Sequence, residues 1–232
     1  MRPIFNPTPD QTFELEGRGE YNFVKHNEHI DALITEGRYA EACEARYQAF
    51  QLLAEALPED EAMPLRWEHA NSRAAIVVLH GSAMDHFRIG DLEMAMAQLE
   101  MLLDCDPEDH LEGINLLALC YIAMDEWEAY EDIEIDLTEK SAEAVVARLW
   151  ASFMRDGEVD KALQSLLKSR HQAFYAELTA AEHPDDDVFR KDIASERPSQ
   201  RAEAREWWLM TEPLWAEFPE FIEELKSNSK NI

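Results

Sequence analysis

The feature that most constrains the fold of this chain is the scarcity of helix-breaking residues over long stretches. No Gly or Pro occurs between Gly113 and Gly157. Ala, Leu and Glu, which all favour helices, account for 86 of the 232 residues, whereas Val, Ile and Thr account for only 25. The sequence therefore predicts an all-α protein.

Charge and composition exclude several classes of function. The chain carries 49 acidic and 21 basic side chains, a formal net charge of −28, and it is 46% hydrophobic, which is enough for a packed core. So acidic a surface argues against partners that are nucleic acids or anionic membranes. No run of 18 apolar residues and no signal-peptide core occurs, and the three cysteines (Cys43, Cys105 and Cys120) form no disulfide or zinc-knuckle pattern. We expect a cytoplasmic protein.

The spacing of apolar residues and the positions of helix-breaking Gly and Pro residues predict four segments along the chain. We expect an irregular lead-in over 1–19, a helical repeat domain over 20–182, a charged linker over 183–199 and an aromatic-rich helical cap over 200–232. Pro64 is expected to begin a long helix, and Asp91 and Asp125 are expected to cap helices. The predicted helices of the repeat domain lie at about 20–35, 39–57, 65–89, 91–105, 111–124, 126–137, 141–155 and 158–181.

These helices alternate with short turns at a period of roughly 34 residues. The stretch 76–109 carries Ala83, Gly90, Ala95 and Pro107 at the spacing of a tetratricopeptide repeat, and it resembles that family. The stretches 23–57, 111–140 and 143–175 match in part. The stretch 111–140 has Tyr130 where the family prefers a small residue, and the stretch 143–175 has Trp150 at such a position, with Gly157 and Ala162 in register.

The resemblance implies an α-α superhelix of about four helix pairs, whose first helices line a concave groove for a peptide or partner helix. Ile34, Ile122 and Ala151 also fall on this face. We hypothesise that its arginines hold a carboxylate of the bound peptide; alternatively, they pair with neighbouring Glu and Asp side chains. Projecting the repeat register onto this chain predicts these partner-binding residues: Asn27, Asp31, His80, Met84, Phe87, Arg88, Asn115, Leu119, Arg148 and Arg155.

Two other interpretations compete with the prediction that the chain is a non-enzymatic scaffold. His26 and His29 share a helix face and, with nearby carboxylates, would suit a metal-binding protein or enzyme, although the zinc-protease string HExxH is absent. Trp207, Trp208 and Trp215 either form an exposed patch that assembles a homo-oligomer such as a homodimer, or pack as a cap on the repeats. No nucleophile motif, phosphate loop or calcium loop occurs, so we expect no catalytic residues, metal or cofactor.

Overall fold

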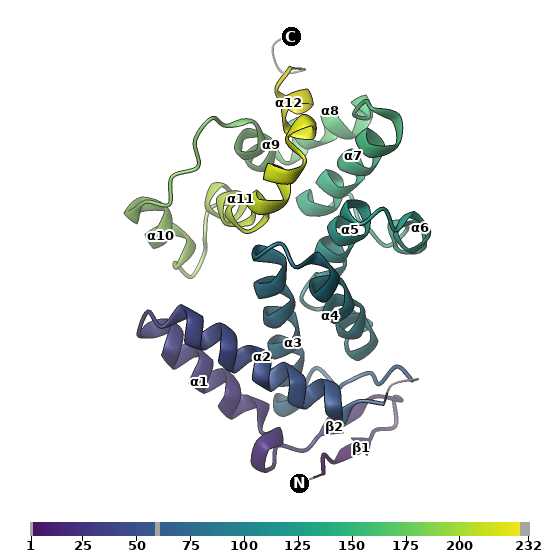
Figure 1. Cartoon of the computed structure of the whole chain (residues 1–232), viewed down its shortest axis with the longest axis vertical. Coiled ribbons are helices and arrows are strands. Elements are labelled where there is room, and N and C mark those ends of the chain that lie inside the picture. The colour runs from purple at the N-terminus through teal and green to yellow at the C-terminus, as the bar shows by residue number, and fades with distance from the viewer. Residues whose placement is uncertain (1, 59–60, 228–232) are drawn as a thin grey trace. The chain divides into compact units, whose positions relative to one another are not determined.

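The computed structural model describes residues 2–58 and 61–227, and most of them are helical (Figure 1). The prediction of a helical protein is confirmed. Glu59 and Asp60 in the loop before Pro64, and residues 228–232 of the predicted cap, lie outside the described residues. The helices are α1 (Phe23–Thr35), α2 (Tyr39–Ala56), α3 (Ala70–Arg88), α4 (Leu92–Cys105), α5 (Gly113–Ala123), α6 (Trp127–Glu134), α7 (Ala142–Asp156), α8 (Lys161–Arg170), α9 (Gln172–Thr179), α10 (Asp187–Ile193), α11 (Gln200–Glu217) and α12 (Pro219–Ser227).

The N-terminal lead-in, predicted to be irregular, contains a β-hairpin. Strands β1 (Phe5–Pro7) and β2 (Phe13–Leu15) pair antiparallel, with Phe5 opposite Leu15. Phe13 also bridges to Leu65, so the backbone of 64–66 bonds to β2 and is not helical. For this reason α3 begins at Ala70, and the prediction that Pro64 begins this helix is wrong.

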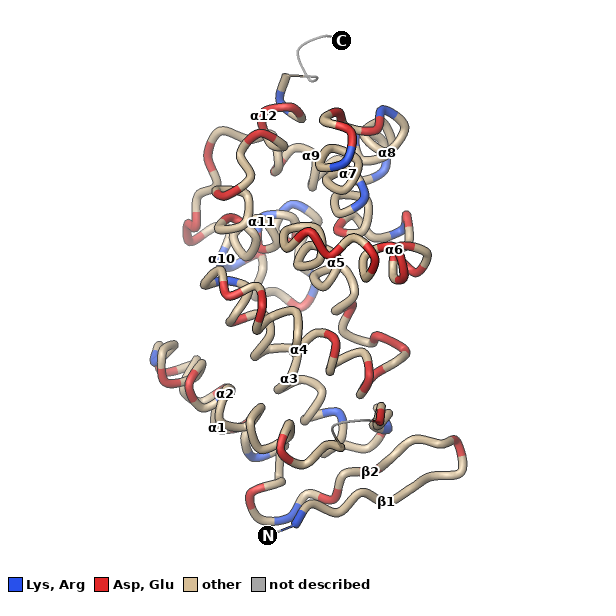
Figure 2. The backbone as a smooth tube through the Cα atoms, turned by 45° about the vertical axis from the view of Figure 1, so that its right-hand side comes forward, with Lys and Arg blue, Asp and Glu red and all other residues tan. Residues whose placement is uncertain are grey.

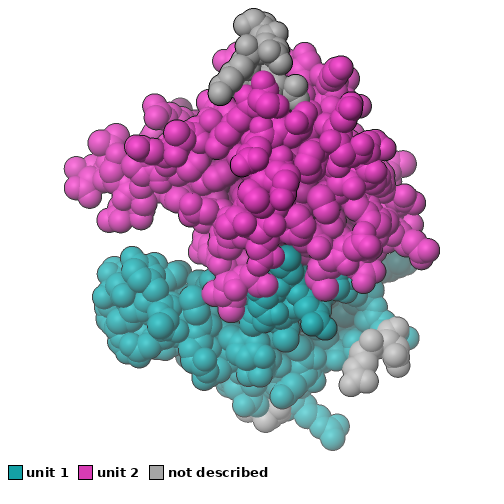
Figure 3. Space-filling model, turned by 45° about the horizontal axis from the view of Figure 1, so that its top comes forward, with its two compact units in different colours: residues 1–86, 91–117 teal, residues 87–90, 118–232 magenta. Residues whose placement is uncertain are grey.

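The chain forms two compact units, made of residues 1–86 and 91–117 and of residues 87–90 and 118–232 (Figure 3). In the first unit, α1 packs on α2, and the hairpin bonds to the start of α3. In the second, α7 packs on α8, α8 on α9, and α11 on α9, α10 and α12. Acidic residues recur along both units, whereas basic residues are sparse (Figure 2).

Three helix pairs, α1–α2, α3–α4 and α5–α6, are joined by the same turn. Gly37, Gly90 and Asp125 each have a positive φ of 62° to 78°, and the next residue's N–H donates to the carbonyl five residues before it. This is the hydrogen bond of a Schellman-type helix end, in which the left-handed residue suits Gly best. Five residues after each left-handed residue lies a fully buried side chain: Ala42, Ala95 and Tyr130.

The fourth pair departs from this geometry. The helix after Gly157 begins four residues later, at Lys161, instead of two. Ala162 is exposed, so it does not take the buried place that Ala42 and Ala95 occupy in the earlier pairs. Asp160 caps α8 by accepting from the N–H groups of Ala162 and Leu163. The longer turn moves the buried positions to Gln164 and Leu167.

Several predicted boundaries also need correction. The helix expected over 158–181 is divided at His171, and the expected linker over 183–199 contains α10. Asp91 caps α4 as predicted, by accepting from Met94 N–H. Asp125 does not cap α6; its carboxylate accepts from the indole N–H of Trp127 instead.

Candidate functional site

The predicted groove residues of α1, and those of α3 up to Met84, lie on neighbouring helices of the first unit. Asn27 on α1 donates from Nδ2 to the carbonyl of Ala74 on α3 over 3.0 Å. Nearer the start of both helices, Phe23 N–H donates to Oδ1 of Asn71 over 2.8 Å. These contacts hold the two helices side by side where they begin.

Each of these helices carries a row of accessible residues at helical spacing, which we call a stripe. Val24 and Ile34 on α1, and Val77 on α3, are exposed by 36%, 37% and 40%. Residues three or four apart share a helix face. We call the two stripes together the α1–α3 face; it consists of Val24, Asn27, Asp31 and Ile34 on α1, and Arg73, Val77, His80 and Met84 on α3.

The sequence projection found Asn27, Asp31, Ile34, His80 and Met84 but missed the apolar Val24 and Val77, and Arg73. Their helical spacing was the available signal, since Val24 precedes Asn27 by three residues and Val77 precedes His80 by three. Arg73 lies over Trp67, with Cζ 6.0 Å from the ring centroid. His80 is half-buried, and burial, followed by the nearby Arg46 guanidinium, lowers its pKa to about 4. His80 is therefore a neutral polar group on this face at pH 7.

Other predicted groove residues are inside the protein. Phe87 and Leu119 are each 1% exposed and Asn115 is 8% exposed, so these side chains belong to the packed interior. Ile122 and Ala151 are buried in the same way. Arg88 is exposed and has no ion pair among the described residues.

The two arginines of α7 differ in their partners. Arg155 donates to Glu131 on α6 over 2.9 Å, and its guanidinium lies 4.7 Å from the Trp127 ring centroid. This pairing with a neighbouring acid is the alternative that the sequence left open. Arg148 instead donates from Nη2 to the backbone carbonyl of Glu134 over 2.9 Å.

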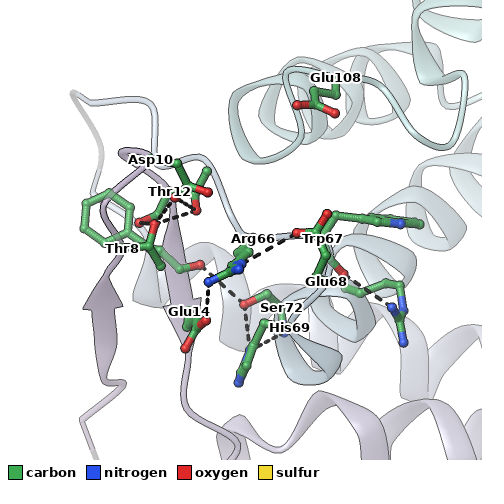
Figure 4. Close-up of polar contacts among 12 residues, drawn as sticks. Thr8, Asp10, Thr12, Glu14, Arg66, Trp67, Glu68, His69, Ser72 and Glu108 are labelled. Carbon is green, nitrogen blue, oxygen red and sulfur yellow. Dashed lines mark hydrogen bonds and ion pairs between the residues drawn. The ribbon is translucent and has the colours of Figure 1, made fainter.

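A polar cluster connects the N-terminal hairpin to α3 (Figure 4). Arg66 lies between the carboxylates of Glu14 and Glu68, at 3.0 and 3.6 Å. Ser72 Oγ accepts from Leu15 N–H over 2.9 Å and lies 3.0 Å from Nδ1 of His69. Ser72 is fully buried, and the hydrogen bond from Leu15 to its hydroxyl is the contact that connects the hairpin to α3.

The histidines proposed as metal ligands are not assembled into a site. His26 Nε2 contacts the Glu20 carbonyl at 2.7 Å, and His29 is exposed. Over 2–58 and 61–227, no three His, Cys, Asp or Glu side chains are grouped as metal ligands. Within the same ranges, no helix is both long and apolar enough to cross a bilayer.

The C-terminal tryptophans belong to the core of the second unit. Trp207, Trp208 and Trp215 are 8%, 7% and 3% exposed, and Trp215 packs edge-on to Trp150 with centroids 5.2 Å apart. Burial removes the exposed aromatic patch on which the homo-oligomer reading depended.

Beside these rings lies a buried ionic cluster that the sequence did not reveal. Glu177 on α9 accepts from Arg205 on α11 through both carboxylate oxygens, and from Nδ1 of His183 over 2.9 Å. His183 stacks on Trp208 with centroids 4.1 Å apart. The members of this ionic cluster are separated by up to 28 residues in the sequence, so no local sequence pattern indicates them.

No family model, curated protein or solved structure matches this chain.

Proposed function

We propose that this chain is a non-enzymatic protein-interaction scaffold, built as a superhelical array of tetratricopeptide-like helix pairs in the cytoplasm. The observation that carries the proposal is the repeated turn of the first three pairs. Gly37, Gly90 and Asp125 share a left-handed conformation, the same long hydrogen bond and a buried residue five positions later. The last two are 35 residues apart, close to the period of this repeat class.

The α1–α3 face is the surface that we assign to a peptide or partner helix. It offers three partly exposed apolar side chains, Val24, Ile34 and Val77, within a polar surround that includes Asp31 and Arg73. Interfaces combine an apolar centre with a polar rim in this way. The partner would insert apolar side chains between the two stripes and bond to the polar groups around them.

Affinity capture with paired variants tests this assignment. Val77→Asp puts a charge at the centre of the face, and we expect it to reduce recovery of the bound partner about tenfold. Val188→Asp is the matched control, because Val188 lies on α10 in the other unit and is 77% exposed. Both variants should retain the helical circular dichroism of the unmodified protein. Equal partner recovery with the two variants would show that the α1–α3 face is not the binding surface.

A further inference from the structure

The chain between α9 and α11 is a connection with little packing of its own (Figure 1). It spans residues 181–199 and contains the short helix α10. The structure describes all of these residues, and none of them is buried. Although α10 packs on α11, a segment with so little buried surface should open at a lower free-energy cost than the helices beside it in the second unit.

The start of this connection is held by the buried ionic cluster of Glu177, His183 and Arg205. Nδ1 of His183 donates to Oε1 of Glu177 over 2.9 Å, since a carboxylate can only accept, and the imidazole ring stacks on Trp208. Nη1 of Arg205 donates to the Pro184 carbonyl over 2.9 Å. The side chains of Glu177, His183 and Arg205 are 6%, 11% and 7% exposed. Two consecutive residues of the connection are therefore anchored on α9 and α11.

The charges of this cluster balance only while His183 is neutral. Glu177 carries one negative charge and Arg205 one positive charge, and the guanidinium bonds both carboxylate oxygens. The other charged groups that act on His183 have opposite signs, since they are Glu212 on α11 and Lys226 on α12. Burial is therefore the main reason that the pKa of His183 is lowered. A proton on this ring would place an uncompensated charge in the interior.

We propose that the cluster of Glu177, His183 and Arg205 is an acid-sensitive latch. At neutral pH it holds residues 181–199 against α9 and α11, and protonation of His183 releases them while these helices remain folded. Below the ordinary pKa of a free imidazole, about 6.5, the released connection binds the proton and the held connection does not, so release becomes more favourable as the pH falls. The latch lies in the second unit and does not depend on the α1–α3 face.

The helices beneath the latch have contacts that do not need His183. Both carboxylate oxygens of Glu177 bond Arg205, and the rings of Phe174 and Trp207 pack with centroids 5.6 Å apart. These contacts should keep α9 on α11 after the imidazole leaves. In contrast, α10 has seven residues, all of them described, and none is buried. So short a helix is not stable alone in water, so it should lose its backbone hydrogen bonds once released.

Hydrogen exchange of the full chain, measured by mass spectrometry, tests the latch. Between pH 7.5 and pH 5.5, amide exchange in residues 187–194 should accelerate about tenfold beyond the intrinsic effect of pH, because the released imidazole gains a proton over this range. Exchange in α11 should not accelerate. Unchanged exchange in 187–194 would overturn the proposal, and so would equal acceleration in α11, because the whole unit would then be unfolding.

Two histidine variants identify the group that binds the proton. His183→Gln removes the titrating ring but keeps a side-chain N–H donor for Glu177, so exchange in 187–194 should no longer respond to pH. His171→Gln is the matched control, because His171 lies in the same unit, 3.1 Å from the Glu139 carbonyl, and this variant should keep the response. Exchange in His183→Gln that is equally slow or equally fast at both pH values supports the latch. A tenfold response that persists in His183→Gln, or that is lost in His171→Gln, overturns it.

Discussion

A single buried amide, that of Asn71, connects three segments at the N-terminal end of the chain. Its Nδ2 donates to the carbonyls of Leu15 and Tyr21, both at 3.0 Å, and its Oδ1 accepts from the N–H groups of Phe23 and Val24 at 2.8 and 3.4 Å. All the bonding capacity of an amide is thus used. Asn thus supplies both the donors and the acceptor that this place requires.

Asn71→Asp should lower the free energy of unfolding by about 3 kcal/mol, because a carboxylate oxygen would replace the donor and face two carbonyl oxygens. Urea denaturation at pH 7 measures the change. Asn6→Asp makes the same substitution at an exposed residue of β1 and should cost less than about 0.5 kcal/mol. Similar midpoints for the two variants would contradict this role of Asn71.

His80 should make the protein sensitive to acid. Its folded pKa, about 4, lies below the usual 6.5 because of burial. Between these values the unfolded chain binds the proton and the folded chain does not, so stability falls as the pH drops from 6.5 towards 4. With an allowance for partial exposure, we expect a loss on the order of 2 kcal/mol.

His80→Leu should flatten this decline in urea titrations performed from pH 7 to pH 4. His29→Gln, at an exposed histidine, serves as the control and should keep it. If His80→Leu leaves the slope unchanged over this range, the proton uptake occurs elsewhere.

At the scale of elements, two stacked aromatic rings connect the loop before α5 to the segment before α3. His110 lies parallel to Trp67, with centroids 4.4 Å apart and planes 3° apart. Its Nδ1 contacts the buried carboxylate of Asp106 at 2.6 Å, and its Nε2 lies 3.5 Å from Glu108. The hydrogen bond to Asp106 is the main reason that the pKa of His110 is raised, and Glu108 and Glu68 act in the same direction.

The stabilisation from His110 should therefore be greatest at low pH. It is fully present below the unfolded pKa near 6.5 and is lost as the pH rises through the folded value. The difference in melting temperature between the unmodified protein and His110→Gln should be larger at pH 5.5 than at pH 9. A difference that is constant with pH would mean that the ring stack acts only by packing.

The sequence predicted elements where the signal was local and missed them where contacts were distant. The spacing of apolar residues and Gly37, Gly90 and Gly157 located the helix pairs, because each signal lies within a few residues of the turn it makes. The hairpin was missed because Pro3, Pro7 and Pro9 indicate irregular chain, and its partners, Leu65 and Ser72, are more than 50 residues away.

Prediction of the candidate surface was limited in the same way, because local sequence signals do not report distant contacts. The repeat register placed Asn27 and His80 on one face, but it could not reveal that Phe87 and Leu119 are buried. It also could not distinguish Arg155, which is paired with Glu131, from Arg148, which is not. Burial and pairing are properties of the packed chain.

At the scale of the whole molecule, the net charge of −28 should oppose folding through self-repulsion. Salt screens this repulsion, since the Debye length falls from about 14 Å at 50 mM to about 4 Å at 500 mM. It also weakens exposed ion pairs such as Arg38 with Glu41, but each of these contributes little. Repulsion among the excess acidic residues therefore dominates.

Raising sodium chloride from 50 to 500 mM should increase the melting temperature by about 3–5 °C at pH 7. Repeating the experiment near pH 4.5, where the chain approaches its isoelectric point, should remove most of this gain. A melting temperature that falls with salt at pH 7 would show that favourable ion pairs outweigh the repulsion.

The bonds of Asn71 also set an order of events during synthesis. A chain leaves the ribosome from its N-terminus, so the hairpin and the first turn of α1 emerge about 50 residues before the side chain that joins them. Until α3 follows, β1 and β2 form an isolated two-stranded hairpin, which is marginal in water. The hairpin and the entry to α1 therefore gain these bonds only once the start of α3 has been made.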